Sequence, residues 1–600
     1  MRNFFLTNFE NQSSENFNII WNSYRENKNS LSLIKFIDQN SKVYKKKIIK
    51  ELQIMYDGIC QNKKLKKKLI IGENFNFLDT FLISEKSFYK DKYNNLSDLI
   101  KCLALIDQIQ SKNIYQIIFN INNENVYDFL KSYCESNNIR FIIKKKLLFN
   151  LYFSKIKFFF NTIYNFFSFF KFLTMRINIP KSKKSFFNKK NIFFDYFCYF
   201  DKKKFINGNY ISNYWGDLPK KMSCKKDSVF CHIYMENNHL KNNEIFKSIN
   251  NLNSLNKEKH FIIDSILNFR IILNIFKKWF YFLLNFFSIK TSIYISLKLK
   301  NNTSYFLFKK SIIDNLIGFN SLLNLYYYYL FDHLFKNDFQ NLDKNNFYYL
   351  CENQGWEKSL LSNIKSKNKK FKIYSIVSTP IRFWDLRYNF LKHELINVRK
   401  KITKICVMSF LSKEILKKNK VSENKIFVVE SLRYESLIKK RESLRNNEKD
   451  NCILIIGDYL KITNRNIENF TLDLLSQNKN INIIAKPHPS NKFSKKFENN
   501  PRIKISNENL IKLSMKTNFC ICSNMTSAAY DLLYLNFKLF ILLANDSINF
   551  SPLKDFKDVE FINEFNDIDI NKKNRNIKNL DFRKNAFLFN QGYKKWSKIL

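Results

Sequence analysis

Short apolar runs alternate with helix-like stretches along most of the chain, and their spacing predicts a series of strands and helices. Six apolar runs have the length of buried parallel strands, at 192–197, 402–407, 425–430, 452–458, 481–485 and 518–522. Helical periodicity is found at 410–418 and 528–533. Strands that alternate with helices are typical of a parallel α/β sheet.

The 600 residues exceed what one hydrophobic core usually organises, so several domains are expected. We predict an N-terminal α/β domain of unknown role at 1–145, with strands at 69–72 and 114–119. Further α/β domains are predicted at 191–438 and at 451–600, the second with a closing C-terminal helix, and the polar residues 439–450 have the composition of a linker. The predicted fold class is α/β, with two Rossmann-like domains facing a cleft and an extra N-terminal α/β domain.

A Phe- and Lys-rich connector at 146–190 separates the first two domains. Its aromatic stretch at 158–170, and a second stretch at 279–289, are each shorter than the roughly 18 apolar residues that a spanning helix needs. Flanking lysines favour helices that lie on an anionic membrane surface, and burial in the core is the alternative. Residues 1–10 lack an apolar run of signal-peptide length. We therefore expect a cytoplasmic protein, peripheral at the inner face of the cytoplasmic membrane if those helices bind lipid.

Charge adds one constraint on partners. The formal net charge is +49, which favours anionic partners in general, although the abundance of Lys, Asn, Ile and Phe also fits a compositional bias. No zinc-finger, RNA-binding or basic-zipper pattern accompanies the charge, so no specific nucleic-acid partner is predicted. The 11 cysteines lack Cys-x-x-Cys spacing, which is typical of reduced thiols in a cytosolic protein.

The clearest candidate chemistry follows the strands at 481–485 and 518–522. Lys486-Pro487-His488-Pro489 comes directly after the first strand, and Ser523, Asn524, Thr526 and Ser527 follow the second. One β-α-β unit separates the two motifs, so a parallel sheet would bring them to the same edge, where α/β proteins bind ligands. We predict that these side chains, with the backbone of Gly457, bind the phosphate of a donor nucleotide. A rigid turn and an ordinary helix cap are the alternative.

Three other segments combine Trp, Gly and charge, at 210–216, 351–357 and 378–388. Their acids Glu352, Glu357 and Asp385 are candidates for the catalytic base, with Glu352 preferred. Candidate acceptor-binding residues are Asn353, Gln354, Trp356, Arg382 and Arg387. Trp356 offers a face on which a sugar stacks, and the arginines suit a carboxylate or phosphate. A helix start with a buried tryptophan, and an Asp385 that only neutralises the arginines, are the alternatives.

Two common nucleotide motifs are absent from the sequence. It has neither a glycine-rich dinucleotide fingerprint nor a Walker phosphate loop, which argues against a dehydrogenase or an ordinary nucleotide hydrolase. No Asp-x-Asp triplet follows a convincing strand. We therefore expect no metal and no cofactor.

The pair Lys486–Pro489 and Ser523–Ser527 resembles the His-Pro and Ser/Thr motifs of bacterial sialyltransferases, polysialyltransferases, capsule Kdo transferases and teichoic-acid polymerases. Segments 210–216, 351–357 and 378–388 are similar to an uncharacterised bacterial surface-carbohydrate-biosynthesis family, although Pro380 stands where that family is expected to have another residue.

This resemblance implies a GT-B-type glycosyltransferase, with the acceptor in domain 191–438 and the donor in domain 451–600. It also implies a nucleotide-activated, cytidine-linked sugar as the donor substrate, a glycan or lipid-linked acceptor, and inverting transfer into a capsule or O-antigen-like polysaccharide. The missing Asp-x-Asp triplet predicts that this transfer is metal-independent. A CDP-polyol phosphotransferase and a non-catalytic polysaccharide assembly factor are the alternatives.

Overall fold

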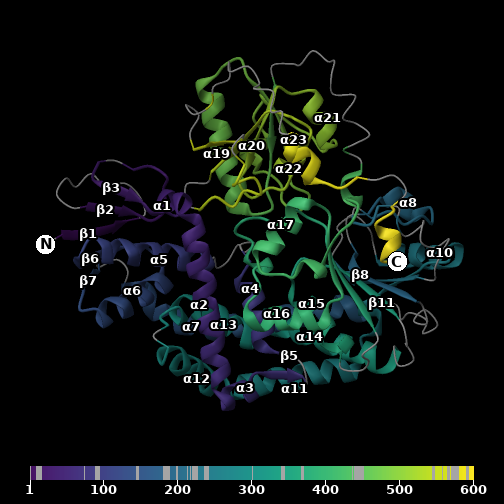
Figure 1. Cartoon of the computed structure of the whole chain (residues 1–600), viewed down its shortest axis with the longest axis horizontal. Coiled ribbons are helices and arrows are strands. Elements are labelled where there is room, and N and C mark those ends of the chain that lie inside the picture. Colours follow the sequence, from purple (N-terminus) through teal and green to yellow (C-terminus); the bar gives the residue numbers. More distant parts are fainter. Residues whose placement is uncertain are drawn as a thin grey trace.

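The computed structural model of the chain describes residues 2–7, 17–26, 28–72, 75–87, 95–143, 148–179, 190–197, 200–212, 214–216, 218, 228–235, 242–300, 302–338, 345–365, 371–435, 437, 452–543, 547–556, 559–563, 568, 580–589 and 593–600. Three parallel sheets organise these residues (Figure 1). The 439–450 linker prediction lies outside the described residues.

The N-terminal sheet has the strand order β3-β2-β1-β6-β7, and all its strands pair in parallel. Its strands are β1 (Arg2–Thr7), β2 (Phe17–Ile20), β3 (Ser30–Ser32), β6 (Ile114–Asn120) and β7 (Arg140–Ile143). The helices of this part are α1 (Leu33–Gln39), α2 (Ser41–Gln61), α3 (Lys63–Lys68), α4 (Phe77–Glu85), α5 (Asn95–Ser111) and α6 (Glu124–Ser136). The strand predicted at 69–72 is β4 (Ile70–Gly72), which pairs antiparallel with β5 (Phe75–Asn76) and lies outside the main sheet.

A central sheet of seven parallel strands has the order β10-β9-β8-β11-β12-β13-β14. Its strands are β8 (Asn191–Phe197), β9 (Ser228–Tyr234), β10 (Lys259–Ile262), β11 (Asn346–Leu350), β12 (Lys372–Val377), β13 (Lys404–Val407) and β14 (Ile426–Val428). Every residue of β8 and β9 is buried, as expected for parallel strands covered on both faces. Helices α8 (Lys202–Ile206), α10 (Asn242–Leu255), α15 (Gly355–Lys365), α16 (Lys392–Lys401) and α17 (Phe410–Lys418) connect them.

The third sheet has the order β17-β16-β15-β18-β19-β20. Its strands are β15 (Cys452–Ile456), β16 (Asn482–Lys486), β17 (Ile503–Ile505), β18 (Phe519–Ser523), β19 (Leu539–Leu542) and β20 (Glu560–Ile562). Its helices are α19 (Lys461–Gln477), α20 (Lys495–Glu498), α21 (Leu510–Met515), α22 (Ala528–Tyr534) and α23 (Leu580–Ala586). In both this sheet and the central sheet, the second and third strands lie on one side of the first strand, and the later strands lie on the other side. This is the Rossmann strand order.

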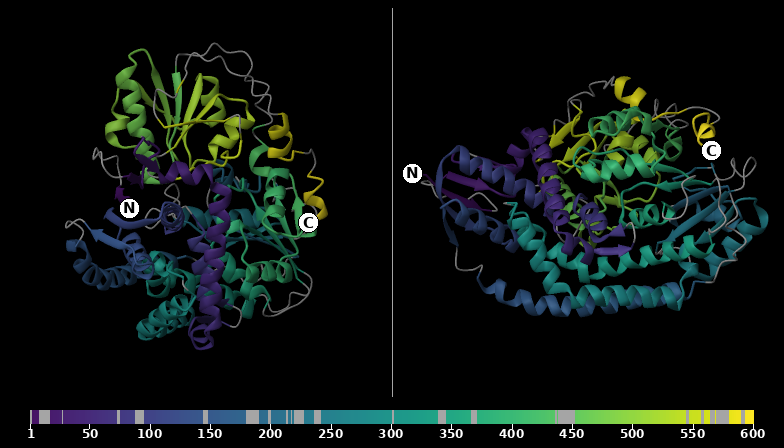
Figure 2. Two further views of the ribbon diagram at one scale, coloured as in Figure 1. Left: turned by 60° about the vertical axis from the view of Figure 1, so that its left-hand side comes forward. Right: turned by 60° about the horizontal axis from the view of Figure 1, so that its bottom comes forward.

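A layer of helices lies below the central sheet. The sequence pattern did not distinguish these helices from the rest of the second domain. After β10 the chain continues through α11 (Phe269–Leu284), α12 (Phe286–Lys298), α13 (Tyr305–Ile317) and α14 (Phe319–His333) before it returns to β11. The connector contains one long helix, α7 (Leu148–Ile177), which packs against α14. Figure 2 shows these helices on the side of the molecule opposite the third sheet.

The C-terminal residues leave the third sheet and dock on the central one. The Trp596 indole is buried; its Nε1 donates to the carbonyl of Glu430 at 3.0 Å, and its ring packs edge-on against Trp215. The Tyr348 hydroxyl of β11 donates to the carbonyl of Ile599 at 2.5 Å. A 3-10 turn (Trp596–Lys598) therefore closes the chain, next to the strands of the central sheet.

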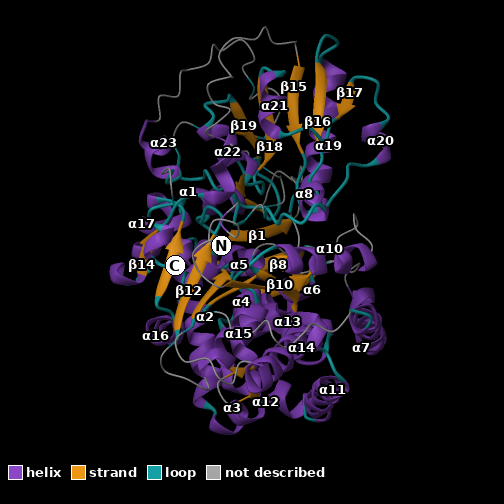
Figure 3. Ribbon diagram, turned by 90° about the vertical axis from the view of Figure 1, so that its right-hand side faces the viewer, coloured by secondary structure: helices purple, strands orange, loops and turns teal. Residues whose placement is uncertain are grey.

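The described residues confirm the predicted α/β fold class, with two Rossmann-like sheets and an extra N-terminal α/β unit. Figure 3 shows the third sheet standing above the central sheet.

Candidate functional site

The loops that follow the strands of the central sheet and of the third sheet meet, and we call this region the junction. Arg382, in the loop after β12, donates Nη1 to the backbone carbonyl of Met525, in the loop after β18. The N–H of Leu588 donates to the carbonyl of Met408, just after β13, at 3.1 Å. Carboxyl ends of parallel strands are where α/β proteins place ligands, so the junction contains the ligand-binding edges of both sheets.

On the third sheet, β15 lies between β16 and β18, which brings the ends of three strands together. A Cβ on Gly457 would lie 2.9 Å from Cζ of Phe493 and 3.2 Å from the backbone N of His488. Gly457 is therefore required for the close approach of the His488 loop. Asp458 connects the two motifs, because its carbonyl accepts from Nδ2 of Asn491 at 3.1 Å and its carboxylate accepts from the Ser523 hydroxyl.

His488 presents a hydrogen-bond donor at this edge. Its Nδ1 accepts the backbone N–H of Ser490 at 3.1 Å, so the neutral ring carries its proton on Nε2. Burial lowers the pKa of His488, and nearby Asp458 opposes that effect only in part. No described residue forms a hydrogen bond with Nε2. The Tyr459 ring stands edge-on to the imidazole with centroids 5.7 Å apart and is 50% exposed.

The Ser/Thr loop lies beside Asp458. Ser523, Asn524 and Thr526 are buried, and the amide oxygen Oδ1 of Asn524 has no hydrogen-bond partner among the described residues. Burial raises the pKa of Asp458, while the Ser523 hydrogen bond and Arg382 lower it. Ser527 precedes α22, whose seven residues are too few for a strong helix dipole, so any ligand here depends on individual side chains and N–H groups.

Lys486 lies apart from this group. Its ammonium Nζ donates to the backbone carbonyl of Glu508 at 2.7 Å, on the side of β17. Burial lowers the pKa of Lys486. The predicted contact of this lysine with a phosphate stays a prediction, and it requires the side chain to leave Glu508.

On the central sheet, the loop after β11 carries Glu352, whose backbone is fixed from both sides. The carboxyl oxygen Oε1 of Glu357 accepts the N–H groups of Glu352 at 2.8 Å and of Gln354 at 3.0 Å. Arg387 donates Nη1 to the Glu352 carbonyl at 2.6 Å. The Glu352 carboxyl group itself is half-buried and forms no hydrogen bond with any described residue. Burial raises its pKa, and Arg387 and Arg433 oppose that rise.

Asp385 and Arg387 form a compact ion pair within one loop. Nε and Nη2 of Arg387 donate to the two carboxylate oxygens of Asp385 at 2.8 and 2.7 Å. Asp385 also accepts the N–H of Arg387 at 3.3 Å and begins a short 3-10 turn. In this conformation Asp385 neutralises Arg387 and holds it against the Glu352 carbonyl, which is the alternative role considered for it from the sequence.

The remaining candidates of this loop have different environments. Trp356 is buried, with its Nε1 donating to the Tyr196 hydroxyl at 2.7 Å, so its ring lies in the core. Asn353 is buried with φ 53°, and its Nδ2 has no partner among the described residues. Gln354 is exposed. The structure therefore brings Glu352 and Gln354 to the surface of the loop and turns Trp356 and Asn353 inward.

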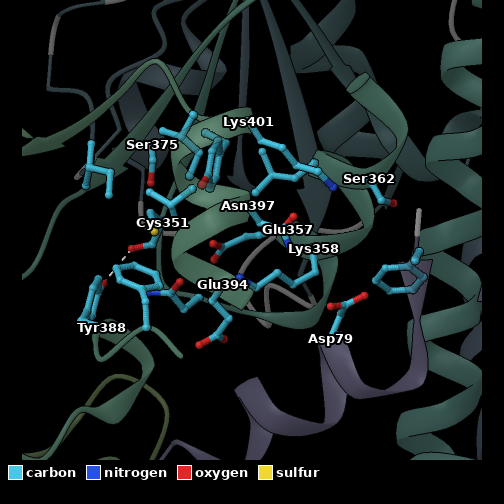
Figure 4. A pocket seen from close by; sticks show the side chains of 18 residues that line it. Asp79, Cys351, Glu357, Lys358, Ser362, Ser375, Tyr388, Glu394, Asn397 and Lys401 are labelled. Carbon is cyan, nitrogen blue, oxygen red and sulfur yellow. Dashed lines mark hydrogen bonds between the residues drawn. The ribbon is translucent and has the colours of Figure 1, made fainter. Parts of the chain in front are cut away.

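A cavity lies behind this loop, between α15, α16 and the central sheet, and Figure 4 shows its lining. Asn353 and Glu357 line it together with Asp79 of the N-terminal unit, Lys358 and Glu394. Burial raises the pKa of Glu357 to about 8, so its carboxyl group holds a proton at neutral pH. The Glu357 side chain therefore supports the Glu352 loop from the cavity side.

Two residues of the junction, Arg433 and Asp531, belong to none of the motifs identified from the sequence. Arg433 follows β14, and its guanidinium carbon lies 5.7 Å from the ring centroids of both Tyr214 and Tyr434. Burial alone would lower the pKa of Arg433, but its neighbours, which include Asp531 and Glu352, raise it. The guanidinium forms no hydrogen bond or ion pair with any residue that the structure describes. Arg433 is therefore a cation whose hydrogen-bond donors are available.

Asp531, in the first turn of α22 in the third-sheet domain, interacts electrostatically with Arg433. Burial raises the pKa of Asp531 to about 7, against the influence of Arg433. A carboxyl group with this pKa exchanges a proton near neutral pH, as a general base or acid must. No sequence pattern marked it, because its environment is made by a residue from the other sheet.

Metal binding has no evident set of ligands. Within the described ranges, no three His, Cys, Asp or Glu side chains lie together as a metal site requires. The expected metal independence stays a prediction.

No protein-family model and no curated protein matches the sequence. Among solved structures, UDP-GlcNAc 2-epimerase from Methanocaldococcus jannaschii is 13% identical, with a TM-score of 0.35 over 64% of this chain and 93% of that one. The epimerase from Neisseria meningitidis bound to UDP-GlcNAc is 10% identical, with a TM-score of 0.32 over 59% and 81%. A variant of the wall teichoic acid polymerase TagF is 9% identical, with a TM-score of 0.26 over 65% and 79%. The sequence identity is low in all three cases.

Proposed function

We propose that the chain is a transferase that binds a nucleotide-activated sugar at the junction and passes the sugar to a glycan or lipid-linked acceptor. The observation that carries this proposal is the pair of unengaged donors, Nε2 of His488 and the guanidinium of Arg433, at the carboxyl edges of two parallel sheets. Hydrogen bonds from ionised or polar donors are the usual means of holding a phosphate. The GT-B-type resemblance supports the same arrangement, with the donor on the third sheet.

The chemistry assigned to these groups is an inverting displacement. The Glu352 carboxylate takes the proton of an acceptor hydroxyl, the acceptor oxygen bonds to the anomeric carbon, and the bond from that carbon to the nucleotide phosphate breaks. His488 and Arg433 stabilise the charge that develops on the leaving phosphate. A raised pKa suits Glu352 to accept a proton, and the Glu357 and Arg387 contacts hold its loop in place.

Asp531 is a second candidate for the base, because burial raises its pKa to about 7, which is near neutral pH. The two carboxyl groups make different predictions. If Glu352 is the base, Glu352→Gln abolishes transfer and leaves nucleotide binding intact, whereas Asp531→Asn retains transfer.

Arg382 and Arg387 have positioning roles in this proposal. Arg382 connects the two sheets through Met525, and Arg387 is engaged with Asp385 and Glu352. Their predicted contact with an acidic acceptor requires these bonds to be exchanged. Cytidine as the base is an expectation that the resemblance contributes, and the experiment below tests it. The expectation that no metal is needed rests on the missing Asp-x-Asp triplet.

The test is a thermal-shift and calorimetry panel with CMP, CDP, UDP and GDP on wild type, His488→Ala and the matched control His333→Ala. A ligand at 100 times its Kd stabilises the folded state by about 2.7 kcal/mol, which is readily visible. We expect one nucleotide to stabilise wild type and the control but not His488→Ala. Binding unaffected by His488→Ala would overturn the assigned site.

Product analysis separates the remaining possibilities. A new glycosidic bond supports sugar transfer, and a new phosphodiester supports the CDP-polyol phosphotransferase. Nucleotide binding with no transfer to any glycan or lipid-linked acceptor, and no effect of Glu352→Gln, would instead identify a non-catalytic assembly factor.

A further inference from the structure

Helices α7, α11 and α12 expose large apolar side chains, which we call the apolar face. Its members are Phe160, Ile163, Tyr164, Phe167, Phe170, Phe269, Leu273, Phe280, Leu284, Phe287 and Ile295. The most exposed are Leu284 at 85%, Phe287 at 76% and Phe269 at 73%. So many large apolar side chains exposed on neighbouring helices are unusual on a monomer in water and indicate a docking surface.

The apolar face belongs to an ordered helical layer. Phe166 of α7 packs against Phe276 and Trp279 of α11, with ring centroids 5.6 Å apart in both pairs. On the opposite side of the same helices, Phe169, Ile275 and Trp279 are buried in the main core. Each helix therefore has one apolar stripe for the core and a second, exposed stripe, and the exposed stripes are held side by side.

The exposed residues follow helical spacing. In α11, Phe269, Leu273, Phe280 and Leu284 recur at intervals of four, seven and four residues, which places them on one side of the helix. The core does not need this exposed stripe, because Ile271, Ile275 and Phe282 form a separate stripe that is buried against the core.

A strongly basic helix borders the apolar face. Lys68 of α3 donates Nζ to the hydroxyl of Ser288 in α12 at 2.6 Å, and the two helices are in contact. Four other lysines of α3 are exposed, Lys63, Lys64, Lys66 and Lys67. The sequences of α3, α7, α11 and α12 contain no Asp or Glu. These four helices therefore carry only positive charge, which favours an anionic partner.

Length and composition limit how deep these helices reach. None of the described helices alone has the length and apolarity of a membrane span. Helices α11 and α12, which are bent by 61° where they meet, pass that test as a pair. Side chains of both helices are engaged in the core, including Ile275 and Ile289. A surface position is the arrangement that keeps those core contacts.

We propose that the apolar face and α3 dock the protein on an anionic lipid bilayer, with the aromatic and aliphatic side chains in the interface and the lysines at the headgroups. Helices that combine an exposed apolar stripe with lysines bind membranes in this way. Figure 1 shows α3, α11 and α12 at the end of the molecule opposite the third sheet, so the donor side faces away from the bilayer.

The test is flotation of the full chain with vesicles of phosphatidylcholine alone and with vesicles that also contain phosphatidylglycerol. Wild type should bind only the anionic vesicles. Leu284→Glu with Phe287→Glu should reduce the partition coefficient by roughly tenfold or more, because each change removes a bulky apolar side chain from the interface. Leu255→Glu, at an exposed leucine of α10, is the matched control and should bind as wild type.

The charge contribution is tested separately. Lys66→Gln with Lys67→Gln should weaken binding by roughly 25-fold, since each lysine near an anionic surface contributes about fivefold. Lys495→Gln with Lys496→Gln, two exposed lysines of α20, is the control and should have little effect. Equal effects of both pairs would show that net charge alone attracts the protein, and would overturn the assigned face.

A second copy of the chain is the competing occupant. If sedimentation without lipid shows a dimer that Leu284→Glu with Phe287→Glu converts to monomer, the membrane proposal is wrong. Vesicle binding requires no nucleotide. A negative result in the vesicle test would therefore leave open whether the junction binds a donor nucleotide.

Discussion

Replacement of Arg433 by methionine is the sharpest test of the junction. The Arg433 guanidinium interacts electrostatically with Glu352 and Asp531 and has no hydrogen-bond partner among the described residues, so its donors are available to a ligand. Hydrogen bonds to a charged group contribute about 1.5–3 kcal/mol each. Loss of about 2–3 kcal/mol corresponds to a roughly 30- to 150-fold higher Kd.

The assay is calorimetry with the nucleotide that the panel identifies, on Arg433→Met, Arg433→Lys and Arg399→Met. Arg399 is exposed on α16 and serves as the control. Arg433→Lys keeps the charge but loses the bidentate geometry and should retain part of the affinity. If Arg433→Met is folded and binds within about twofold of wild type, the assignment of Arg433 to the phosphate is wrong.

Three further predictions concern stability and metal dependence. Burial raises the pKa of Glu357 to about 8 from 4.5, so the folded state retains a proton that the unfolded state releases, and stability should fall as the pH rises from about 4.5 to about 8. Glu357→Gln keeps the acceptor oxygen and should flatten that pH profile in urea unfolding. Trp596→Ala should lower the free energy of unfolding by about 3–5 kcal/mol, because a buried indole and its bond to Glu430 are lost. Transfer activity should be unchanged by EDTA, and activity that is lost with EDTA and restored by Mn²⁺ would contradict metal independence.

Exposed residues provide the controls for the two stability predictions. Glu560→Gln should leave the pH profile unchanged, and Phe410→Ala should change the unfolding free energy by less than the Trp596 substitution. An unfolding profile of Glu357→Gln that parallels wild type would show that another group causes the pH dependence.

The central strands of the third sheet, β15 and β18, were predictable because each is a short, nearly continuous apolar run whose residues are almost all buried. The runs at 452–458 and 518–522 correspond to β15 (Cys452–Ile456) and β18 (Phe519–Ser523), and the helix at 410–418 corresponds to α17 (Phe410–Lys418). The first strand, β1 (Arg2–Thr7), was not assigned from the sequence. The insertion α11–α14 was also not recognised, because aromatic stretches with buried and exposed stripes resemble both core and interface helices.

Strand-end motifs located the junction but not the function of each side chain. His488 and Ser523 do lie at one edge, because parallel pairing of β15, β16 and β18 requires it. The function of each side chain depends on its burial and on its partners from other elements. Arg433 and Asp531 become notable only when two sheets bring them together, which no local pattern records.

The N-terminal domain also contacts the central sheet and the third-sheet domain near the junction. Lys45 of α2 donates Nζ to the carbonyl of Phe383 at 2.5 Å, and Lys554, from the third-sheet domain, lies 5.6 Å from the ring of the same phenylalanine. Asp38 accepts the N–H of Asn549 at 3.2 Å and pairs with Lys554 at 3.6 Å.

Phe383 directly follows Arg382, whose guanidinium connects the central and third sheets. Rotation of the third sheet away from the central one would therefore break contacts of the N-terminal domain as well as the Arg382 bond. Opening for a ligand must either be small or carry the N-terminal domain with it. This coupling gives the extra α/β unit a physical role at the site although it contributes none of the groups assigned to the chemistry.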